Sequence, residues 1–312
     1  MRLFALAVSL VLGCGRLGFD TVGDDIADPA APDGGARDDI DGGPAVGGPD
    51  AKPPENCADA ACRRLVVDQA TFLRDDNAWY PATTSRFELD RYEVTVARFR
   101  EFVAAGFGTR ATAPAGGAGA HPAIAGSGWQ TSWAALLATS TSDLVDRLES
   151  APSATYSPSP SSDDELPIVG VTWYEAFAFC VWDGARLPTV AEHEAAAFGG
   201  DEQRLYPWGA DYDASNVAIG ALDRIARHSP AGDARWGHAD LVGNADEWAL
   251  DFFGALPQPC IDCANLTPQS TPTRVLLGGS FLSNTSDFAQ TALLHGAGPG
   301  QRTGTVGFRC AR

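Results

Sequence analysis

The sequence is poor in basic residues and nearly devoid of methionine. Its 312 residues include 22 Lys and Arg against 40 Asp and Glu, which gives a formal net charge of −18, and Met1 is the only methionine. Because nucleic-acid phosphates and anionic lipid surfaces bind through Lys and Arg, this balance disfavours both as partners. Hydrophobic residues make up 45% of the chain, which is enough for a sizeable globular core.

The amino-terminal apolar run is too short to cross a membrane. It extends from Leu3 to Leu12, whereas a transmembrane helix needs roughly 20 apolar residues. A short apolar run after Met1-Arg2 is typical of a signal peptide, which we assign to residues 1–13. The run ends in Val11-Leu12-Gly13-Cys14, which resembles a bacterial lipobox and predicts lipidation of Cys14. The alternative is an ordinary secretory signal with an incidental cysteine.

Apolar side chains are also scarce in residues 14–56. Gly, Pro, Ala and Asp dominate this segment, and its ten acidic residues stand against Arg16, Arg37 and Lys52. Such a composition offers too little apolar surface to offset the entropy of ordering. We interpret it as a disordered tether between the lipid anchor and a domain over residues 57–312. The protein is therefore expected to be exported and lipid-anchored to the bacterial cell envelope. The acidity suits a solvated tether, and calcium attraction is the alternative.

Several catalytic motifs are missing. The five histidines are His121, His193, His228, His238 and His295, and they form no His-x-Glu-x-x-His pattern. An iron site of the two-histidine, one-carboxylate type is therefore not indicated. Gly-x-Ser-x-Gly does not occur either, which argues against a serine hydrolase.

The most informative stretch runs from Pro167 to Gly209. It opens with a strand-like run, 168–171, and continues with two capping boxes, Thr172 with Glu175 and Thr189 with Glu192, each of which predicts a helix start. The first helix should cover residues 173–182 and stop at Gly184, and Gly199-Gly200 should end the second.

The flanking segments add further elements. Residues 65–72 and 86–92 are predicted strands, and residues 96–104 a helix with Phe99, Phe102 and Val103 facing inward. Residues 106–165 form an insertion rich in Gly, Ala, Ser and Pro. Large apolar residues recur in it at roughly helical spacing, at Trp129, Trp133, Leu136, Leu137, Leu144 and Leu148. We expect two small helices packed on the core, with a lid or groove wall as the alternative.

Five ordered blocks of the sequence resemble the formylglycine-generating enzyme, or sulfatase-modifying factor, family. They are FELDRYEVTVARFREFV from Phe87, the 167–209 stretch with YPWG continuing to Asn216, LVGNADEW from Leu241, LLGGSF from Leu276, and GFRCA from Gly307. The resemblance implies a loop-rich α+β domain, an elaborated variant of the C-type-lectin-like fold. Short strands and frequent Gly and Pro agree with that class.

The resemblance also places the catalytic copper of active relatives. In those enzymes two cysteines after Gly-Gly-Ser bind Cu(I) and engage the substrate thiol. Here those positions are Ser283 and Phe288. Since Cu(I) requires soft thiolate ligands, we expect no copper and no formylglycine-generating activity.

Relatives also bind calcium in two loops, and both can be placed in this sequence. The first set of ligands is Asn216, the Val217 carbonyl, Asp223 and the Ile225 carbonyl; the second is Asp240, the Gly243 and Ala245 carbonyls, and Glu247. Calcium favours such mixtures of carboxylate and carbonyl oxygens. The alternative for the second loop is a set of turn-forming hydrogen bonds.

Seven cysteines minus a lipidated Cys14 leave an even number, so an exported protein should carry disulfides. The family resemblance favours Cys180 with Cys310. The pairs Cys57/Cys62 and Cys260/Cys263 are then local disulfides, and a four-thiolate zinc site is the alternative.

Two functions follow from these observations. The first is an exported, lipid-anchored binding or structural module for an unknown protein or carbohydrate ligand, in which the fold has lost its oxidase chemistry. The second is an oxygen-dependent oxidoreductase of the same superfamily with a diverged active site.

Overall fold

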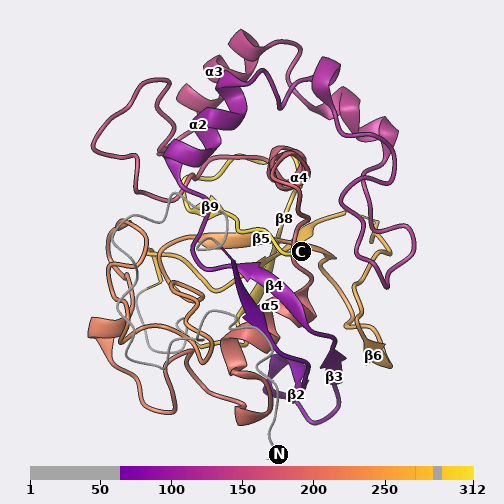
Figure 1. Ribbon diagram of the computed structural model, residues 1–312, viewed down its shortest axis with the longest axis vertical. Coiled ribbons are helices and arrows are strands. Elements are labelled where there is room, and N and C mark those ends of the chain that lie inside the picture. The colour runs from indigo at the N-terminus through magenta and orange to yellow at the C-terminus, as the bar shows by residue number, and fades with distance from the viewer. Residues whose placement is uncertain (1–63, 271, 284–289) are drawn as a thin grey trace, which may run out of the picture. The chain divides into compact units, whose positions relative to one another are not determined.

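The computed structural model describes residues 64–270, 272–283 and 290–312 (Figure 1). The predicted signal peptide, Cys14, the tether, Cys57, Cys62 and Phe288 lie outside the described residues. Within the described part of the chain, no helix is both long and apolar enough to span a bilayer.

Short helices and strands alternate with long irregular connections. The α-helices are α2 (Val96–Ala104), α3 (Thr141–Glu149), α4 (Trp173–Trp182) and α5 (Val190–Phe198), and single 3-10 turns are η1 (Arg74–Asp76), η2 (Arg110–Thr112), η3 (Thr131–Leu136), η4 (Gly200–Glu202) and η5 (Ala214–Asn216). The strands are β1 (Arg64–Val67), β2 (Ala70–Leu73), β3 (Pro81–Thr84), β4 (Phe87–Asp90), β5 (Asp246–Phe252), β6 (Cys260–Ile261), β7 (Arg274–Leu277), β8 (Leu294–Ala297) and β9 (Val306–Gly307). This is the expected loop-rich α+β class.

The strands form three small sheets. One sheet has the order β8-β7-β5-β9, a second the order β2-β3-β6, and β1 pairs with β4. In the first sheet, β5 runs antiparallel to β7 and parallel to β9. Figure 1 shows α4 between the α2 and α3 helices on one side and β5, β8 and β9 on the other. The main core fills this space, because buried side chains of all these helices and of β5, β7 and β9 form one cluster.

The two capped helices have the predicted bounds. Glu175 accepts a hydrogen bond from the Thr172 amide at 3.0 Å and donates its own amide to the Thr172 hydroxyl at 3.2 Å, and Thr189 and Glu192 repeat this exchange. Gly199 ends α5 with φ +68, a conformation that strongly favours glycine. The helix predicted over residues 96–104 is also confirmed.

The insertion packs on the core largely as expected. Its 3-10 turn η3 and helix α3 bring Trp129, Leu137, Leu144 and Leu148 into the buried cluster. Trp133 is half-buried and makes an edge-to-face contact with Trp173 at 5.1 Å between ring centroids. Leu136, by contrast, is 49% exposed, because a 3-10 turn does not keep the helical face that its spacing suggested.

Three strand assignments need correction. Residues 168–171 are buried but form no strand, because Gly170 adopts φ +82, which interrupts the extended backbone, and its amide is shared between the Thr303 carbonyl and the Val306 carbonyl at the start of β9. The predicted strand 65–72 is two strands, β1 and β2, in different sheets. The sequence pattern predicts no strand over residues 246–252, which form β5 and are buried except for the half-buried Phe252.

Candidate functional site

The Gly-Gly-Ser turn follows β7 and is held tightly against the loop before β5. Gly278 has φ +83, and a Cβ atom there would lie 2.6 Å from the Leu241 carbonyl oxygen, so only glycine fits. Ser280 is buried, and its amide donates to the Ser283 hydroxyl at 3.2 Å. The Ser283 amide in turn bonds to the Ser280 carbonyl at 2.8 Å. Ser283 therefore closes the turn that follows Gly-Gly-Ser.

An acid and a histidine meet beside this turn. Nε2 of His295, on β8, lies 3.3 Å from Oδ1 of Asp246, the first residue of β5. Burial raises the pKa of Asp246 to about 7, although the Ser280 and Thr305 hydroxyls oppose the shift. Burial lowers the pKa of His295. The pair sets an acid of raised pKa beside a histidine of lowered pKa, and it supplies no soft ligand for Cu(I).

The sequence could not have shown this pair, nor two similar ones. His121 Nε2 lies 3.4 Å from Glu192 Oε1, and His193 Nε2 lies 3.6 Å from Glu247 Oε2. Every partner comes from a distant segment, so local spacing carried no signal. His193 is buried in α5, which agrees with a packing role.

The second predicted calcium set surrounds a buried arginine. Arg309 donates to both carboxylate oxygens of Glu247 at 2.6 to 2.9 Å, and its Nη2 also donates to the Asp240 carbonyl at 3.0 Å. Glu93 accepts from the Asn244 side chain at 2.7 Å and the Ala245 amide at 3.0 Å. A fixed guanidinium charge thus occupies the carboxylate of Glu247, so this residue does not fit a second cation, while the Asp240 carboxylate accepts the Ala226 amide at 2.7 Å.

Buried acids crowd around this arginine. Burial raises the pKa of Glu93, and the neighbouring carboxylates of Asp240 and Glu247 raise it further. Burial also raises the pKa of Asp240 to about 6. Arg309 lowers the pKa of Glu247 against the effect of burial. Glu247 is therefore the carboxylate that keeps its charge beside Arg309.

The first predicted calcium set fits the chemistry of the ion better. The carbonyl oxygens of Val217 and Ile225 accept no backbone hydrogen bond from the described residues. Asp223 is half-buried, and its Oδ1 accepts the Arg224 amide at 2.8 Å. Hydrogen bonds join the two loops, because the Asp223 amide donates to Asn244 Oδ1 at 2.9 Å. No group of three or more His, Cys, Asp or Glu residues suited to a metal occurs in the described part of the chain.

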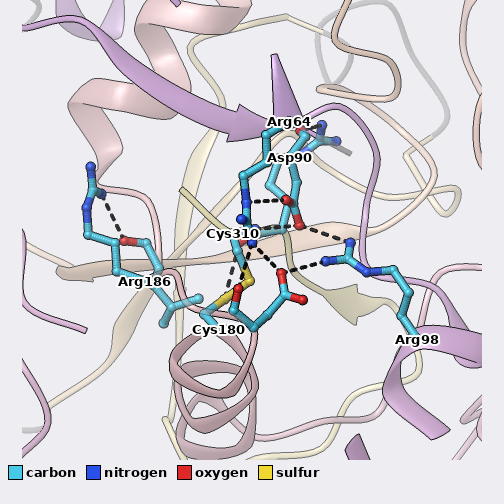
Figure 2. The surroundings of a disulfide bond; sticks show 9 residues. Arg64, Asp90, Arg98, Cys180, Arg186 and Cys310 are labelled. Carbon is cyan, nitrogen blue, oxygen red and sulfur yellow. Dashed lines mark hydrogen bonds and ion pairs between the residues drawn. A yellow bond between two sulfur atoms is a disulfide. The ribbon is translucent and has the colours of Figure 1, made fainter. Parts of the chain in front are cut away.

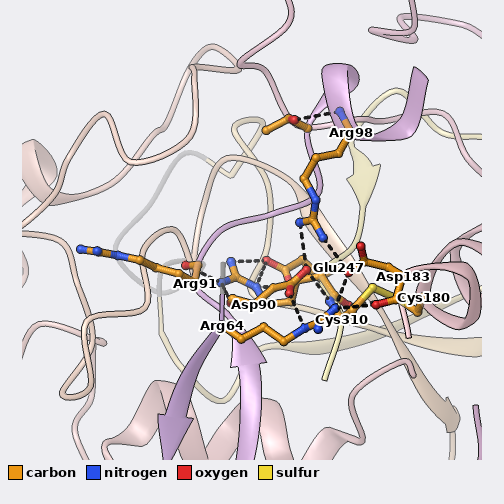
Figure 3. A network of polar contacts seen from close by, with 10 residues as sticks. Arg64, Asp90, Arg91, Arg98, Cys180, Asp183, Glu247 and Cys310 are labelled. Atoms are coloured by element: carbon orange, nitrogen blue, oxygen red, sulfur yellow. Dashed lines mark hydrogen bonds and ion pairs between the residues drawn. A yellow bond between two sulfur atoms is a disulfide. The ribbon is translucent and has the colours of Figure 1, made fainter. Parts of the chain in front are cut away.

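The disulfide between Cys180 and Cys310 has formed as the resemblance implied, and it joins α4 to the segment after β9. Figure 2 shows Asp90 between two arginines beside it. Asp90 is fully buried and accepts from Arg64 at 3.1 Å and Arg98 at 3.0 Å. Figure 3 shows the same network with Asp183, which Arg98 also contacts at 3.0 Å. Each arginine thus bridges two carboxylates, which balances the buried charge.

Cys260 and Cys263 form the second disulfide of the described residues, across a three-residue separation. The zinc alternative is thus wrong for these two cysteines, because their sulfur atoms are bonded to each other. Their partners in that alternative, Cys57 and Cys62, lie outside the described residues.

Two shallow surface clefts lie elsewhere, with volumes of about 300 and 410 Å³. Pro122, Arg186 and Arg312 line both. The first also contains His121 and Glu192. Burial opposes ionisation of Glu192, but Arg186 and His121 lower its pKa to about 2. The charges in the cleft are therefore largely paired with each other, and Arg312 is exposed at its edge.

Taken with the Gly-Gly-Ser turn, this disulfide-bonded α+β architecture defines the class of protein. The chain belongs to the sulfatase-modifying factor enzyme 1-like domain family, whose model matches residues 51–312.

Curated relatives resemble about half of the chain. A serine/threonine-protein kinase pkn1 of Chlamydia caviae is 38% identical over 150 residues, which is 47% of this chain and 24% of that protein. An inactive C-alpha-formylglycine-generating enzyme 2 of Bos taurus is 30% identical over 166 residues, 47% of this chain and 50% of that protein. A formylglycine-generating enzyme of Thermomonospora curvata is 30% identical over 169 residues, which is 46% of this chain and 55% of that protein. The matches thus span between a quarter and about half of these relatives.

Solved structures share the fold over most of the chain. PvdO from Pseudomonas aeruginosa aligns with a TM-score of 0.54 and 19% identity, covering 80% of this chain and 93% of PvdO. CarF aligns with a TM-score of 0.52 and 17% identity, covering 80% of this chain and 97% of CarF. At these identities the likeness confirms the predicted fold and nothing beyond it.

Proposed function

We propose that this protein is an exported, lipid-anchored binding or structural module that has the sulfatase-modifying factor fold without its copper chemistry. The observation that carries the proposal is the state of the sulfur atoms. All four cysteines among the described residues are joined in two disulfides, Cys180 with Cys310 and Cys260 with Cys263. The described residues therefore leave no thiolate to act beside the Gly-Gly-Ser turn, and Cu(I) requires such soft ligands.

The geometry of Ser283 supports the same conclusion. Its hydroxyl accepts the Ser280 amide, so the side chain stabilises the turn. A hydroxyl with an ordinary high pKa is a poor ligand for Cu(I). The ligand of the module is a protein or a carbohydrate, and the net charge of −18 argues against nucleic acid.

A structural calcium ion is a further part of the proposal. We place it at the first loop, with Asn216, Asp223 and the Val217 and Ile225 carbonyls as ligands, because those carbonyls lack backbone partners among the described residues. Calcium is coordinated by six to eight oxygen atoms, and water molecules can complete its coordination shell. When bound, the ion would neutralise Asp223 and fix a loop that contains little regular structure.

The test of the lost chemistry uses the purified protein with Cu(I), oxygen and a peptide carrying Cys-x-Pro-x-Arg. We expect no aldehyde by mass spectrometry and no copper retained after dialysis. A Ser283→Cys/Phe288→Cys variant is the matched comparison, and it should retain copper because the two soft ligands are restored. Aldehyde formation by the wild type would overturn the proposal. If the variant does not retain copper, the proposal that Ser283 and Phe288 stand at the copper-ligand positions is wrong.

A further inference from the structure

The disulfide between Cys260 and Cys263 differs from the other disulfide in its surroundings. Cys180 and Cys310 are completely buried, whereas Cys263 is half-buried and Cys260 is 4% exposed. The loop that the second disulfide closes is also very short. Because a disulfide stabilises mainly through the loop it closes in the unfolded chain, this one contributes far less to folding than the link between residues 180 and 310.

A buried cation contacts the sulfur of the half-buried Cys263. Nη1 of Arg74 lies 3.4 Å from Sγ of Cys263, and Nη2 donates to the Pro257 carbonyl. Arg74 is 1% exposed, and its Nε has no hydrogen-bond partner among the described residues. No carboxylate of those residues lies within 4.0 Å of its guanidinium, since Arg74 takes part in none of their ion pairs. A disulfide sulfur is a weak acceptor, so this buried charge is poorly compensated.

The acids that face Arg74 compensate its charge only in part at neutral pH, because Glu194 is largely protonated there and Asp251, although largely ionised, makes no ion pair with Arg74 within 4.0 Å. The nearest are Glu194 and Asp251, with the Tyr80 hydroxyl beside them. Glu194 is buried, its Oε2 has no partner among the described residues, and burial raises its pKa to about 8. Burial also raises the pKa of Asp251 to about 6. The group that would best satisfy Arg74 is a thiolate at Cys263, which forms only when the disulfide is reduced.

We propose that the Cys260–Cys263 disulfide is a redox-active site that exchanges with the thiols of another exported protein. A substrate thiolate attacks Sγ of Cys263, and the bond between the two protein sulfurs breaks with Cys260 leaving as a thiolate that takes a proton. A second thiolate of the same substrate then attacks the first substrate sulfur in the mixed disulfide, which forms the substrate disulfide, and Cys263 leaves as the thiolate that Arg74 stabilises. One protein disulfide is reduced for each substrate disulfide formed, so two electrons pass between them.

The loop holds the disulfide where a polypeptide can reach it. The Asp262 amide bonds to the Thr83 carbonyl on β3, and both Asp262 carboxylate oxygens accept from Ser85, at 2.6 and 2.7 Å. Ile261, between the two cysteines, is 73% exposed on β6, at the edge of its sheet. An exposed apolar side chain next to the sulfur favours a protein substrate over a small charged thiol.

The first experiment compares the two disulfides in one molecule. The purified full-length protein is equilibrated in mixtures of reduced and oxidised dithiothreitol, trapped with an alkylating reagent and mapped by mass spectrometry. Cys260 and Cys263 should become alkylated at ratios that leave Cys180 and Cys310 fully paired. Equal resistance of both disulfides would overturn the proposal.

The second experiment reads the charge on Cys263 directly. After selective reduction, its alkylation rate against pH should report an apparent pKa below the ordinary value of about 8.5, while Cys260 should not. An Arg74→Met variant should alkylate at Cys263 about tenfold more slowly at pH 7, and Arg74→Lys should recover part of the rate. The wild-type profile stands even where a variant fails to fold. An unshifted Cys263 in the wild type, or a profile unchanged in Arg74→Met, would contradict the assigned role of Arg74.

Discussion

Arg309 and Glu247 form a buried ion pair that connects the segment after β9 to strand β5. Nε and Nη2 of Arg309 donate to the carboxylate at 2.6 to 2.9 Å, and neither side chain exceeds 2% exposure. The same guanidinium bonds to the carbonyls of Asp90, Arg91, Ala239 and Asp240. Through these bonds Arg309 joins three segments that are distant in the sequence, namely residues 90–91, residues 239–240 and strand β5.

The first prediction concerns this pair. Arg309→Met leaves Glu247 buried beside Glu93 and Asp240 without a cation, and we expect it to lower the free energy of unfolding by about 3–5 kcal/mol. The double variant Arg309→Met/Glu247→Leu should lose less, because no charge then remains unpaired at that position. Urea unfolding monitored by tryptophan fluorescence measures both. A double variant less stable than Arg309→Met would contradict the assigned charge balance.

The second prediction concerns calcium. A ligand that binds only the folded state stabilises it by about 2.7 kcal/mol at a hundredfold excess over Kd, so chelation should lower the melting temperature. Asp223→Asn should abolish the shift, because it removes the only carboxylate of the first loop. Asp68→Asn is the charge-matched control, since Asp68 is exposed and lies 3.9 Å from Arg86.

Glu247 distinguishes the two loops in the same measurement. Glu247→Gln should destabilise the protein equally with calcium and with chelator, since its carboxylate belongs to Arg309. A chelator shift that disappears in Glu247→Gln but persists in Asp223→Asn would assign calcium to the second loop instead. No shift in the wild type would remove the calcium proposal.

The sequence predicted the local features of this fold and missed the long-range ones, for a physical reason. The helix starts at Thr172 and Thr189 were predictable because a capping box needs only residues three apart. Strand β5 was hidden because both of its faces are buried and carry acids, Asp246 on one face and Glu247 on the other, with Asp251 further along the strand, and acids usually mark surfaces. Those acids are tolerated inside because distant groups satisfy them, such as Arg309 for Glu247 and the Val190 amide for Asp251.

The candidate site was also predictable only where it depends on residues that are close together in the sequence. The expectation that Ser283 stands at a copper-ligand position came from a contiguous motif, Gly278-Gly279-Ser280. The proximity of Asp246 and His295 depends on the strand order β8-β7-β5. Asp246 lies on β5 and His295 on β8, and β7 lies between these two strands in the sheet, an order that the sequence does not show. Likewise, the contact of Arg74 with Cys263 joins residues 189 positions apart.

The third prediction concerns the anchor. Cys14→Ser should move the protein from the membrane fraction to the soluble exported fraction, because the acyl chains attach to that thiol. Cys57→Ser is the matched control and should stay with the membrane. Equal partitioning of Cys14→Ser and wild type in cell fractionation would remove the lipoprotein proposal.

The fourth prediction is that the protein is more stable at pH 6.5 than at pH 8. Burial raises the pKa of Glu194 to about 8 in the folded state, against an ordinary value of 4.5. Between these values the folded state binds more protons than the unfolded state, so stability falls as pH rises. Asp246, with a pKa of about 7, acts in the same direction. Two groups act oppositely. The pKa of His238 is lowered to about 3 by burial, which costs stability as pH falls below about 6.5, and the pKa of Glu192 is lowered to about 2, which costs stability as pH falls below about 4.5. The expected trend therefore rests on Glu194 and Asp246 between pH 6.5 and 8.

Glu194→Gln isolates the largest of these effects. The amide mimics the protonated acid, so the melting temperature of the variant should fall less between pH 6 and 8 than that of the wild type, whose slope from this group is at most about 1.4 kcal/mol per pH unit. Asp143→Asn is the control, because the pKa of Asp143 is lowered to about 2 by hydrogen bonds from Thr139 and Arg147, and its effect lies at acid pH. Calorimetric melting curves at fixed ionic strength measure both. A wild type equally stable at pH 6.5 and pH 8, or a slope that Glu194→Gln leaves unchanged, would show that Glu194 ionises normally in the folded protein.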